Sequence, residues 1–238
     1  MGEKHEEPSW LLLVPGDGDR TVLYIGGGAP AVTAALSAAF GRVVAVECVT
    51  SRPDAAWSHG GQSRAANVLR VRAAALDLPV RLASVDLAVL DGVVDELPYD
   101  VTDERPSTVQ HQLLQAVHSV LKPGAVVCLG VGNRWVRLRS IRRTSGGYVR
   151  SVLGYRELLE SVGFSGVRVW CAFPSWEDPK FLVECEQTVF DYFLRVFDRG
   201  RRWGIRRAAG RLLHSLGVLK YAAPSYAILA KREASASA

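Results

Sequence analysis

The stretch Thr21–Ala31, TVLYIGGGAPA, joins a run of apolar residues to three consecutive glycines and a proline. The apolar run predicts a strand, and the following VTAALSAAF has the apolar spacing of a helix. Pro30 suits the first turn of that helix, where its missing N–H group costs nothing. Such a glycine turn lets backbone approach a ligand and directs the first N–H groups of the helix towards it. The stretch therefore predicts a cofactor site at the end of the first strand.

Strand-like and helix-like runs alternate beyond this stretch, to about residue 130, and continue less regularly to the end. Strands are expected at Thr21–Ile25, Arg42–Glu47, Val68–Val71, Val85–Leu90, Ala125–Val131, Gly166–Phe173 and Ser225–Lys231, and helices near Pro30–Phe40, Thr108–Leu121 and Tyr155–Val162. The alternation predicts a parallel sheet with helices on both faces, an α/β fold.

The length of 238 residues suits one large α/β domain with a substantial core. We divide the chain into an N-terminal segment, residues 1–20, and a domain at residues 21–238. The four cysteines are widely spaced, so neither a zinc nor a redox motif is indicated, and no metal-ligand spacing is found. The first ten residues, MGEKHEEPSW, are mainly charged and lack the apolar core of a signal peptide, so we expect a cytoplasmic protein.

An acid ends the second predicted strand. Glu47 stands about twenty residues after the glycines, where a carboxylate can bind ribose hydroxyls. Taken alone, the spacing Gly26-x-Gly28-x-x-Ala31 also satisfies the fingerprint of nicotinamide dinucleotide sites. A glycine-rich turn without any ligand is the third interpretation. The order of the other motifs decides among them.

In that order the sequence resembles the class I S-adenosylmethionine-dependent methyltransferases. The resemblance is carried by LYIGGGAP, VVAVE, ALDLPVRLASVDLAVLDG, SVLKPGAVVCLGV and YRELLESVGFSGVRVW, over roughly residues 20–173, with a further strand at the end. The LKPGA turn is not part of the dinucleotide pattern. The resemblance implies a Rossmann-like, doubly wound sheet of seven strands whose last strand is antiparallel. It also implies S-adenosylmethionine as cofactor and methyl transfer, with a place in biosynthesis.

Three positions depart from the family's pattern. Tyr24 stands where an acid usually precedes the glycines, Pro30 replaces the third glycine, and Ala74 stands where an acid near the adenine is common. The cofactor contacts that the resemblance implies are Tyr24, Gly26, Gly27, Gly28, Glu47, Asp77 as a substitute for Ala74, and Asp91. The departures leave open a relative that no longer methylates and instead binds a partner or catalyses another reaction. The glycine fingerprint leaves open a nicotinamide-dependent oxidoreductase.

Residues that follow the fourth to sixth strands are the candidates for chemistry, because the site of a doubly wound sheet lies beyond the carboxyl ends of its strands. Asp91, directly after the fourth strand, is the first choice for a general base or acceptor contact, ahead of Asp95 and Glu96. The alternative for Asp91 is a solvated loop acid or a helix cap. His59, in a polar segment on the expected adenosine side, is the second catalytic candidate.

The connection from Phe181 to about Pro224 is far longer than a hairpin needs, and it mixes arginines with aromatic residues. We expect a mainly helical basic insertion that packs over the carboxyl ends of the strands and controls access of the acceptor. Substrate contacts are expected from Asn133, Arg134, Trp176 and Arg195.

The arginines predict a small or glycan-like acceptor, with an anionic or lipid-linked one as a variant, since guanidinium groups pair with phosphates and carboxylates. Peripheral contact with an anionic membrane surface and a merely solvated basic face are the alternatives. Nucleic acid is disfavoured, because neither an Asn/Asp-Pro-Pro-Tyr segment after the fourth strand nor a Pro-Cys motif is present. The sequence is silent on oligomeric state.

Overall fold

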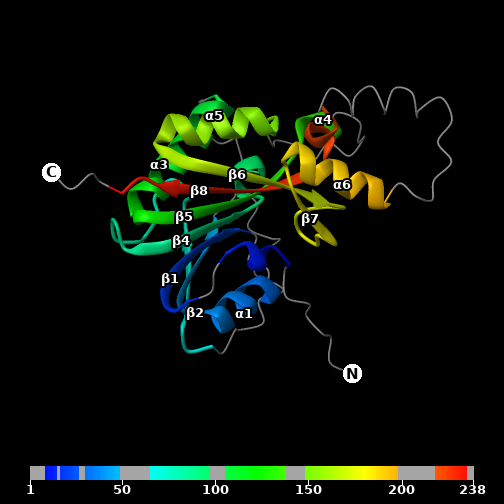
Figure 1. Cartoon of the computed structure of the whole chain (residues 1–238). Coiled ribbons are helices and arrows are strands. Elements are labelled where there is room, and N and C mark those ends of the chain that lie inside the picture. The colour runs from blue at the N-terminus through cyan, green and yellow to red at the C-terminus, as the bar shows by residue number, and fades with distance from the viewer. Residues whose placement is uncertain are drawn as a thin grey trace.

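The computed structural model of the chain describes residues 9–14, 17–26, 30–48, 65–96, 105–137, 148–197 and 218–234. It is built around one twisted sheet with helices on both of its faces (Figure 1). The strands are β1 (Asp17–Gly26), β2 (Phe40–Cys48), β3 (Val68–Ala73), β4 (Val85–Asp91), β5 (Leu121–Gly132), β6 (Phe164–Phe173), β7 (Phe181–Glu184) and β8 (Ser225–Arg232). The helices are η1 (Ser9–Leu13), α1 (Pro30–Ala39), α2 (Val93–Glu96), α3 (Pro106–Val120), α4 (Arg134–Arg137), α5 (Val152–Val162), α6 (Gln187–Phe197) and η5 (Leu219–Ala222).

The strand order is β3-β2-β1-β4-β5-β8-β6-β7. The first five strands of the chain are parallel, and β8 lies antiparallel between β5 and β6. The predicted Rossmann-like sheet and its antiparallel last strand are therefore confirmed. β8 runs antiparallel because the chain enters it from the edge where the parallel strands end: its first residue, Ser225, pairs with Gly132 at the end of β5.

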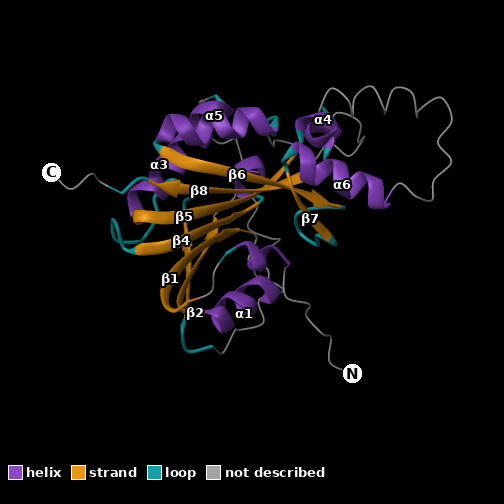
Figure 2. Ribbon diagram, viewed as in Figure 1, coloured by secondary structure: helices purple, strands orange, loops and turns teal. Residues whose placement is uncertain are grey.

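One strand of this sheet was not expected. Phe181–Glu184 forms β7, which pairs antiparallel with the end of β6, as the ribbon diagram shows (Figure 2). The expectation of a mainly helical connection from Phe181 onwards is wrong at this point. The physical reason is that Val183 alternates inward and is buried, while the neighbouring backbone completes the hydrogen bonding of the β6 edge.

The rest of that connection is described only in part. The expected helical insertion contains α6, whose Phe190 and Phe193 pack against Phe173 of β6. Residues 198–217 of the insertion lie outside the described residues. α6 is seen beside β7 and α4 at one end of the sheet (Figure 1). Nothing among the described helices is long and apolar enough to span a bilayer.

The hydrophobic core has two layers, one on each face of the sheet. On one face α3 and α5 bury Leu113, Val117 and Leu159 against the strands, and on the other α1 and η1 bury Leu36 and Trp10. β4 and β5 lie in the middle of this sandwich, which explains their nearly continuous apolar sequences. Packing on both faces fixes the strands, so their carboxyl ends form a rigid edge.

Helix ends follow the local sequence. Ser151 caps α5 by accepting a hydrogen bond from the N–H of Gly154. Gly163 ends the helix in the left-handed conformation, with φ of 101°, as the sequence predicts. α3 begins at Pro106, where a proline costs no hydrogen bond.

Candidate functional site

The carboxyl ends of four neighbouring strands bring the candidate cofactor residues together. In the strand register, Gly26 of β1 lies opposite Glu47 of β2 on one side and Asp91 of β4 on the other. Asp91 in turn lies opposite Gly130 of β5. Three residues that sequence reasoning chose separately are therefore adjacent at one edge of the sheet, where ligands of doubly wound folds bind.

Gly26 has no room for a side chain. A Cβ atom at this position would lie 2.9 Å from the Tyr24 hydroxyl oxygen and 3.1 Å from the Cβ of Asp91. Glycine here therefore lets the Tyr24 ring cross the end of β1 and reach Asp91. Gly27 and Gly28 lie outside the described residues, as does His59, so their expected roles stay predictions.

Asp91 is held by two donors from opposite directions. The Tyr24 hydroxyl donates a hydrogen bond to Oδ2 at 3.1 Å, and the Trp176 indole Nε1 donates one to Oδ1 at 2.6 Å. Burial raises the pKa of the Asp91 carboxyl above its usual range, while the hydrogen bonds from Trp176 and Tyr24 oppose that rise and the charge of Glu177 adds to it. The result is a half-buried carboxyl group with a fixed orientation.

Trp176 is the centre of this arrangement. Its side chain is only 2 % exposed and stacks on Trp10, with ring centroids 5.2 Å apart and planes at 18°. The ring lies against Gly130, where a Cβ atom would stand 1.7 Å from the indole nitrogen. The segment between β6 and β7 thus folds back over the sheet edge and inserts an indole between η1 and β5.

A cleft of about 280 Å³ opens beside the indole. It lies over the ends of β4 and β5, and the β6–β7 segment and the start of β8 form its other sides. Its charged lining residues, among those the structure describes, are Asp95, Glu96 and Glu177. The described lining of the cleft is thus acidic, although the whole chain has a net charge of +5.

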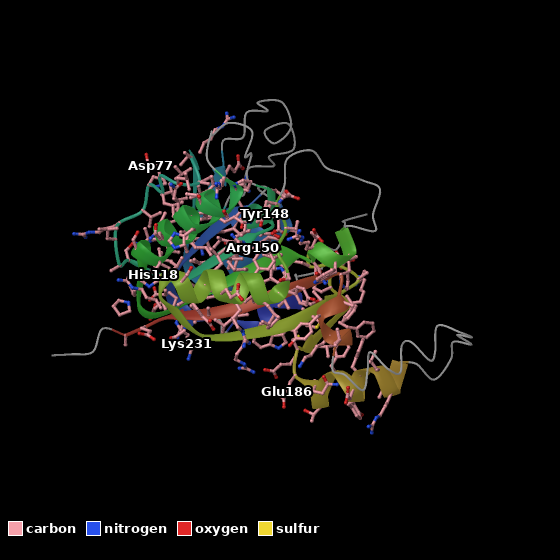
Figure 3. The ribbon with its side chains drawn as sticks, turned by 90° about the horizontal axis from the view of Figure 1, so that it is seen from above. Asp77, His118, Tyr148, Arg150, Glu186 and Lys231 are labelled. Carbon is pink, nitrogen blue, oxygen red and sulfur yellow. The ribbon has the colours of Figure 1, made fainter. Side chains whose placement is uncertain are left out.

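Asp95 anchors the floor of the cleft. Its Oδ2 accepts a hydrogen bond of 2.6 Å from the N–H of Gly132, and its Oδ1 accepts one from the Tyr155 hydroxyl. The same hydroxyl accepts a hydrogen bond from the N–H of Arg150, whose guanidinium donates to the buried Gln110. Figure 3 shows Arg150 beside Tyr148, whose carbonyl oxygen accepts from Gln110. This network ties the loop after β4 to the segment that enters α5.

Comparison with known protein families agrees with this geometry. Residues 23–129, which run from β1 to β5 and include Glu47 and Asp91, match the family model described as a methyltransferase domain. This part of the chain is therefore similar to a methyltransferase domain. The matched part of this domain contains the strand edge and ends at Leu129, just before the cleft residues of β5.

Solved structures share the fold of this chain. An S-adenosylmethionine-dependent methyltransferase from Thermotoga maritima superposes with a TM-score of 0.58 at 14% identity, covering 95% of this chain and 88% of its own. Haemonchus contortus phosphoethanolamine N-methyltransferase 2, in complex with phosphomonomethylethanolamine and S-adenosylhomocysteine, gives 0.59 at 15% identity, over 98% of this chain and 54% of its own length. A Haloferax volcanii protein in complex with the Trm112 methyltransferase activator gives 0.59 at 16% identity, over 97% and 91%. A search of curated protein sequences finds no match.

The residues expected to contact a substrate lie in different surroundings. Asn133 is 1 % exposed, and its side-chain amide donates to the carbonyl oxygens of Tyr221 and Ala223 and to the Tyr226 hydroxyl. Those bonds hold the entry to β8, so the amide is turned away from the cleft. The buried Trp176 is likewise engaged with Asp91 rather than offered to a ligand.

The charged candidates lie on the surface. Arg134 is exposed at the start of α4, next to Asn133 and Val136 of the cleft lining. Arg195 is exposed on α6 and is not among the residues that line the cleft. Asp77 is exposed in the turn that follows β3. The last residue of β3, Ala73, lies opposite Cys48 at the end of β2.

Sequence reasoning missed Gly130, Trp10, Gln110 and Tyr155, which surround the candidate site. Gly130 had a usable signal, since a glycine inside an apolar strand often marks the close approach of another group. Trp10 lay in the segment set apart from the domain. Gln110 and Tyr155 fall on ordinary amphipathic helices, and nothing in their local sequence points to Asp95.

Proposed function

We propose that the protein transfers a methyl group from S-adenosylmethionine to a small acceptor that carries an amine. The observation that carries the proposal is the adjacency of Glu47, Gly26 and Asp91 at the strand edge of a methyltransferase domain, beside a cleft with acidic lining. The cofactor belongs to the strand edge and the acceptor to the cleft.

The strand edge suits the cofactor. Glu47 is half-buried at the end of β2 and can accept hydrogen bonds from two ribose hydroxyls. Gly26 lets Tyr24 pack across the end of β1 and contact Asp91. When bound there, S-adenosylmethionine supplies a methyl group on a positively charged sulfur atom.

Asp91 compensates for the acid that is missing from position 24. The Tyr24 side chain reaches from the usual place of that acid to the carboxylate of the neighbouring strand, 3.1 Å away. A negative charge is therefore kept at the end of β1, but it comes from β4. We assign Asp91 to the positive methionine end of the cofactor, with Tyr24 and Trp176 as the residues that position it.

The cleft favours an amine over an anion as the acceptor. Asp95, Glu96 and Glu177 give its described lining a negative charge, which attracts a cationic group and repels phosphates and carboxylates. An anionic group elsewhere on the acceptor would have to face Arg134 at the rim. Among the described residues, only Arg134 at the rim is placed to bind the anionic or lipid-linked acceptor that the arginines predict.

The chain's own residues would act on the acceptor by position and charge. An amine must lose a proton before its nitrogen can attack, and the exposed carboxylates Glu96 and Glu177 can take up that proton. Alignment of the nitrogen with the methyl group supplies the rest, since methyl transfer is an in-line displacement that depends on proximity. Asp95 holds the cleft floor in place.

Calorimetric titration tests the cofactor. The full chain should bind S-adenosylmethionine and its demethylated product and should not bind a nicotinamide dinucleotide. Glu47→Gln, which keeps the shape of the side chain, should bind the cofactor more weakly than the wild type. Tight nicotinamide binding would instead favour the oxidoreductase interpretation.

A matched panel of acceptors tests the substrate class. With labelled cofactor we expect methylation of ethanolamine-type amines, less of the same amines carrying a phosphate, and none of a sugar lacking an amine. A Glu96→Gln/Glu177→Gln variant should lose selectivity for amines but still bind the cofactor. Cofactor binding without any transfer would support the relative that no longer methylates, and transfer to sugars alone would contradict the amine.

A further inference from the structure

A second cleft lies at the other side of β6, away from the strand edge. It has a volume of about 470 Å³ and lies between α5, the β6–β7 hairpin and η5. Cys185 is part of its lining and is half-buried. Figure 3 shows Glu186, the next residue, where the chain leaves β7 for α6. The proposed methyl transfer uses none of these groups.

A second thiol stands directly behind Cys185. Cys171 of β6 pairs with Val183 of β7 in the sheet register, and Cys185 is two residues further along, so both side chains lie on the same face of the sheet. The Cys171 thiol donates its S–H to the carbonyl oxygen of Lys220, its sulfur also interacts with the Cys185 thiol, and Cys171 is fully buried in the core. Both cysteines are free thiols in this structure.

The strand pairing does not hold the two cysteines equally. Cys171 lies inside β6 between two paired strands, while Cys185 follows the last residue of β7 and is anchored by its N–H to the carbonyl oxygen of Val169. Cys185 can therefore shift towards Cys171 at small cost. That freedom is what closure of a bond between their sulfur atoms requires.

The charges around Cys185 favour its thiolate. The hydrogen bond with Cys171 lowers the pKa of the Cys185 thiol, burial opposes this, and the positive charges of Lys220 and Arg156 lower it further. The same hydrogen bond and burial raise the pKa of Cys171, which stays a thiol. The other charged residues lining the cleft are Arg168, Glu184 and Glu186, and Arg168 is paired with Glu184 at 2.9 Å.

We infer that Cys185 and Cys171 form a peroxide-sensitive pair, in which Cys185, at the cleft, is the attacking thiol and Cys171 the buried resolving thiol. The Cys185 sulfur attacks one oxygen of hydrogen peroxide, the O–O bond breaks, hydroxide leaves and a sulfenic acid forms. The Cys171 sulfur then attacks the Cys185 sulfur, and the S–O bond breaks. The hydroxyl group leaves with the Cys171 proton as water, so that peroxide is reduced and the two thiols are oxidised to a disulfide.

Formation of a disulfide between Cys171 and Cys185 would alter a segment that lines the acceptor cleft. The Cys171 thiol also lies 3.4 Å from the carbonyl oxygen of Lys220 in η5, and the disulfide has no S–H to donate to it. The chain runs from η5 directly to Pro224 and Ser225, which line that cleft. Oxidation therefore loosens the segment that enters β8.

Peptide mapping after peroxide treatment tests the inference on the full chain. The protein is treated with hydrogen peroxide, denatured and alkylated with N-ethylmaleimide. We expect a peptide in which Cys171 is linked to Cys185, loss of alkylation at both residues, and full recovery with dithiothreitol. Amide exchange of the segment from η5 to Ser225 should rise in the same sample.

Three variants separate the roles of the thiols. Cys185→Ser should give no linked peptide, whereas Cys171→Ala should leave Cys185 as a sulfenic acid that dimedone traps. Cys48→Ser/Cys128→Ser should form the link as the wild type does. The inference is wrong if wild-type Cys171 and Cys185 stay fully alkylated after peroxide treatment that oxidises free cysteine, or if the linked peptide contains Cys48 or Cys128. Neither outcome depends on whether the protein methylates anything.

Discussion

Replacing Trp176 by phenylalanine removes one hydrogen bond while leaving an aromatic ring in place. The lost bond is the one of 2.6 Å from the indole nitrogen to Oδ1 of Asp91. The matched control is Trp10→Phe, because Trp10 belongs to the same stack, is 1 % exposed, and is not the donor to Asp91. Both variants lose similar ring area, so their difference isolates the hydrogen bond.

The size of that difference follows from the charge of the acceptor. A hydrogen bond to a charged group contributes about 1.5–3 kcal/mol to stability, roughly twice the neutral value. In a protein of this length, 1 kcal/mol shifts the melting temperature by about 2–4 °C. Trp176→Phe should therefore melt about 3–12 °C below Trp10→Phe at neutral pH.

The difference should depend on pH with a definite sign. The folded-state pKa of Asp91 lies above the reference value of 3.8, so the folded protein holds this proton more tightly than the unfolded chain does. Burial of Asp91 therefore destabilises the folded protein least below pH 3.8, and the destabilisation grows as pH rises from there through the folded-state pKa. Loss of the Trp176 donor raises the folded pKa further, so the additional cost falls on the ionised form.

Chemical denaturation of the wild type and both variants, at about pH 7 and about pH 4, measures this directly. The free energy of unfolding of Trp176→Phe should approach that of Trp10→Phe at the acid pH and fall below it at neutral pH. Equal losses in the two variants at both values would refute the reasoning. Trp176 would then act only as a packed ring, and Asp91 would have other means of orientation.

Three further changes test the rest of the site. Gly130→Ala should lower the free energy of unfolding by about 1–3 kcal/mol in denaturant titration, because the new methyl group overpacks against the Trp176 ring. Its control, Gly18→Ala, has nothing within 4 Å and should change the free energy of unfolding by less than about 0.5 kcal/mol. An unchanged stability of Gly130→Ala would mean that the Trp176 ring does not lie against Gly130. Asn133→Ala should lower the melting temperature, because two backbone carbonyl groups lose their donor at about 1–3 kcal/mol each, and a change in KM alone would restore Asn133 as a substrate contact. Glu47→Ala should weaken binding of S-adenosylmethionine by about 1–3 kcal/mol in calorimetry, and unchanged affinity would remove Glu47 from the cofactor site.

Much of the cofactor edge was predictable, and most of the acceptor cleft was not. Glu47 and Asp91 each follow an apolar strand, and parallel strands end at a common edge, so local sequence was enough to place both beside Gly26. Asn133 also follows such a strand, yet its amide turns inward because three acceptors from the β8 end of the chain are there to receive it. The rule of position therefore placed Glu47 and Asp91 at the sheet edge, but it did not predict the direction of the Asn133 amide, which distant acceptors decide.

By itself, the sequence determined the order of strands and helices and the parallel sheet, because apolar periodicity and turn residues act over a few neighbours along the chain. The tertiary structure alone decided which polar groups meet. Trp176 reaches Asp91 across 85 positions of sequence, and Cys185 meets Cys171 only because β7 folds back on β6. Hydrogen bonds between distant residues depend on how whole elements pack, and the free energy that orients each side chain comes from partners that its own neighbourhood does not contain.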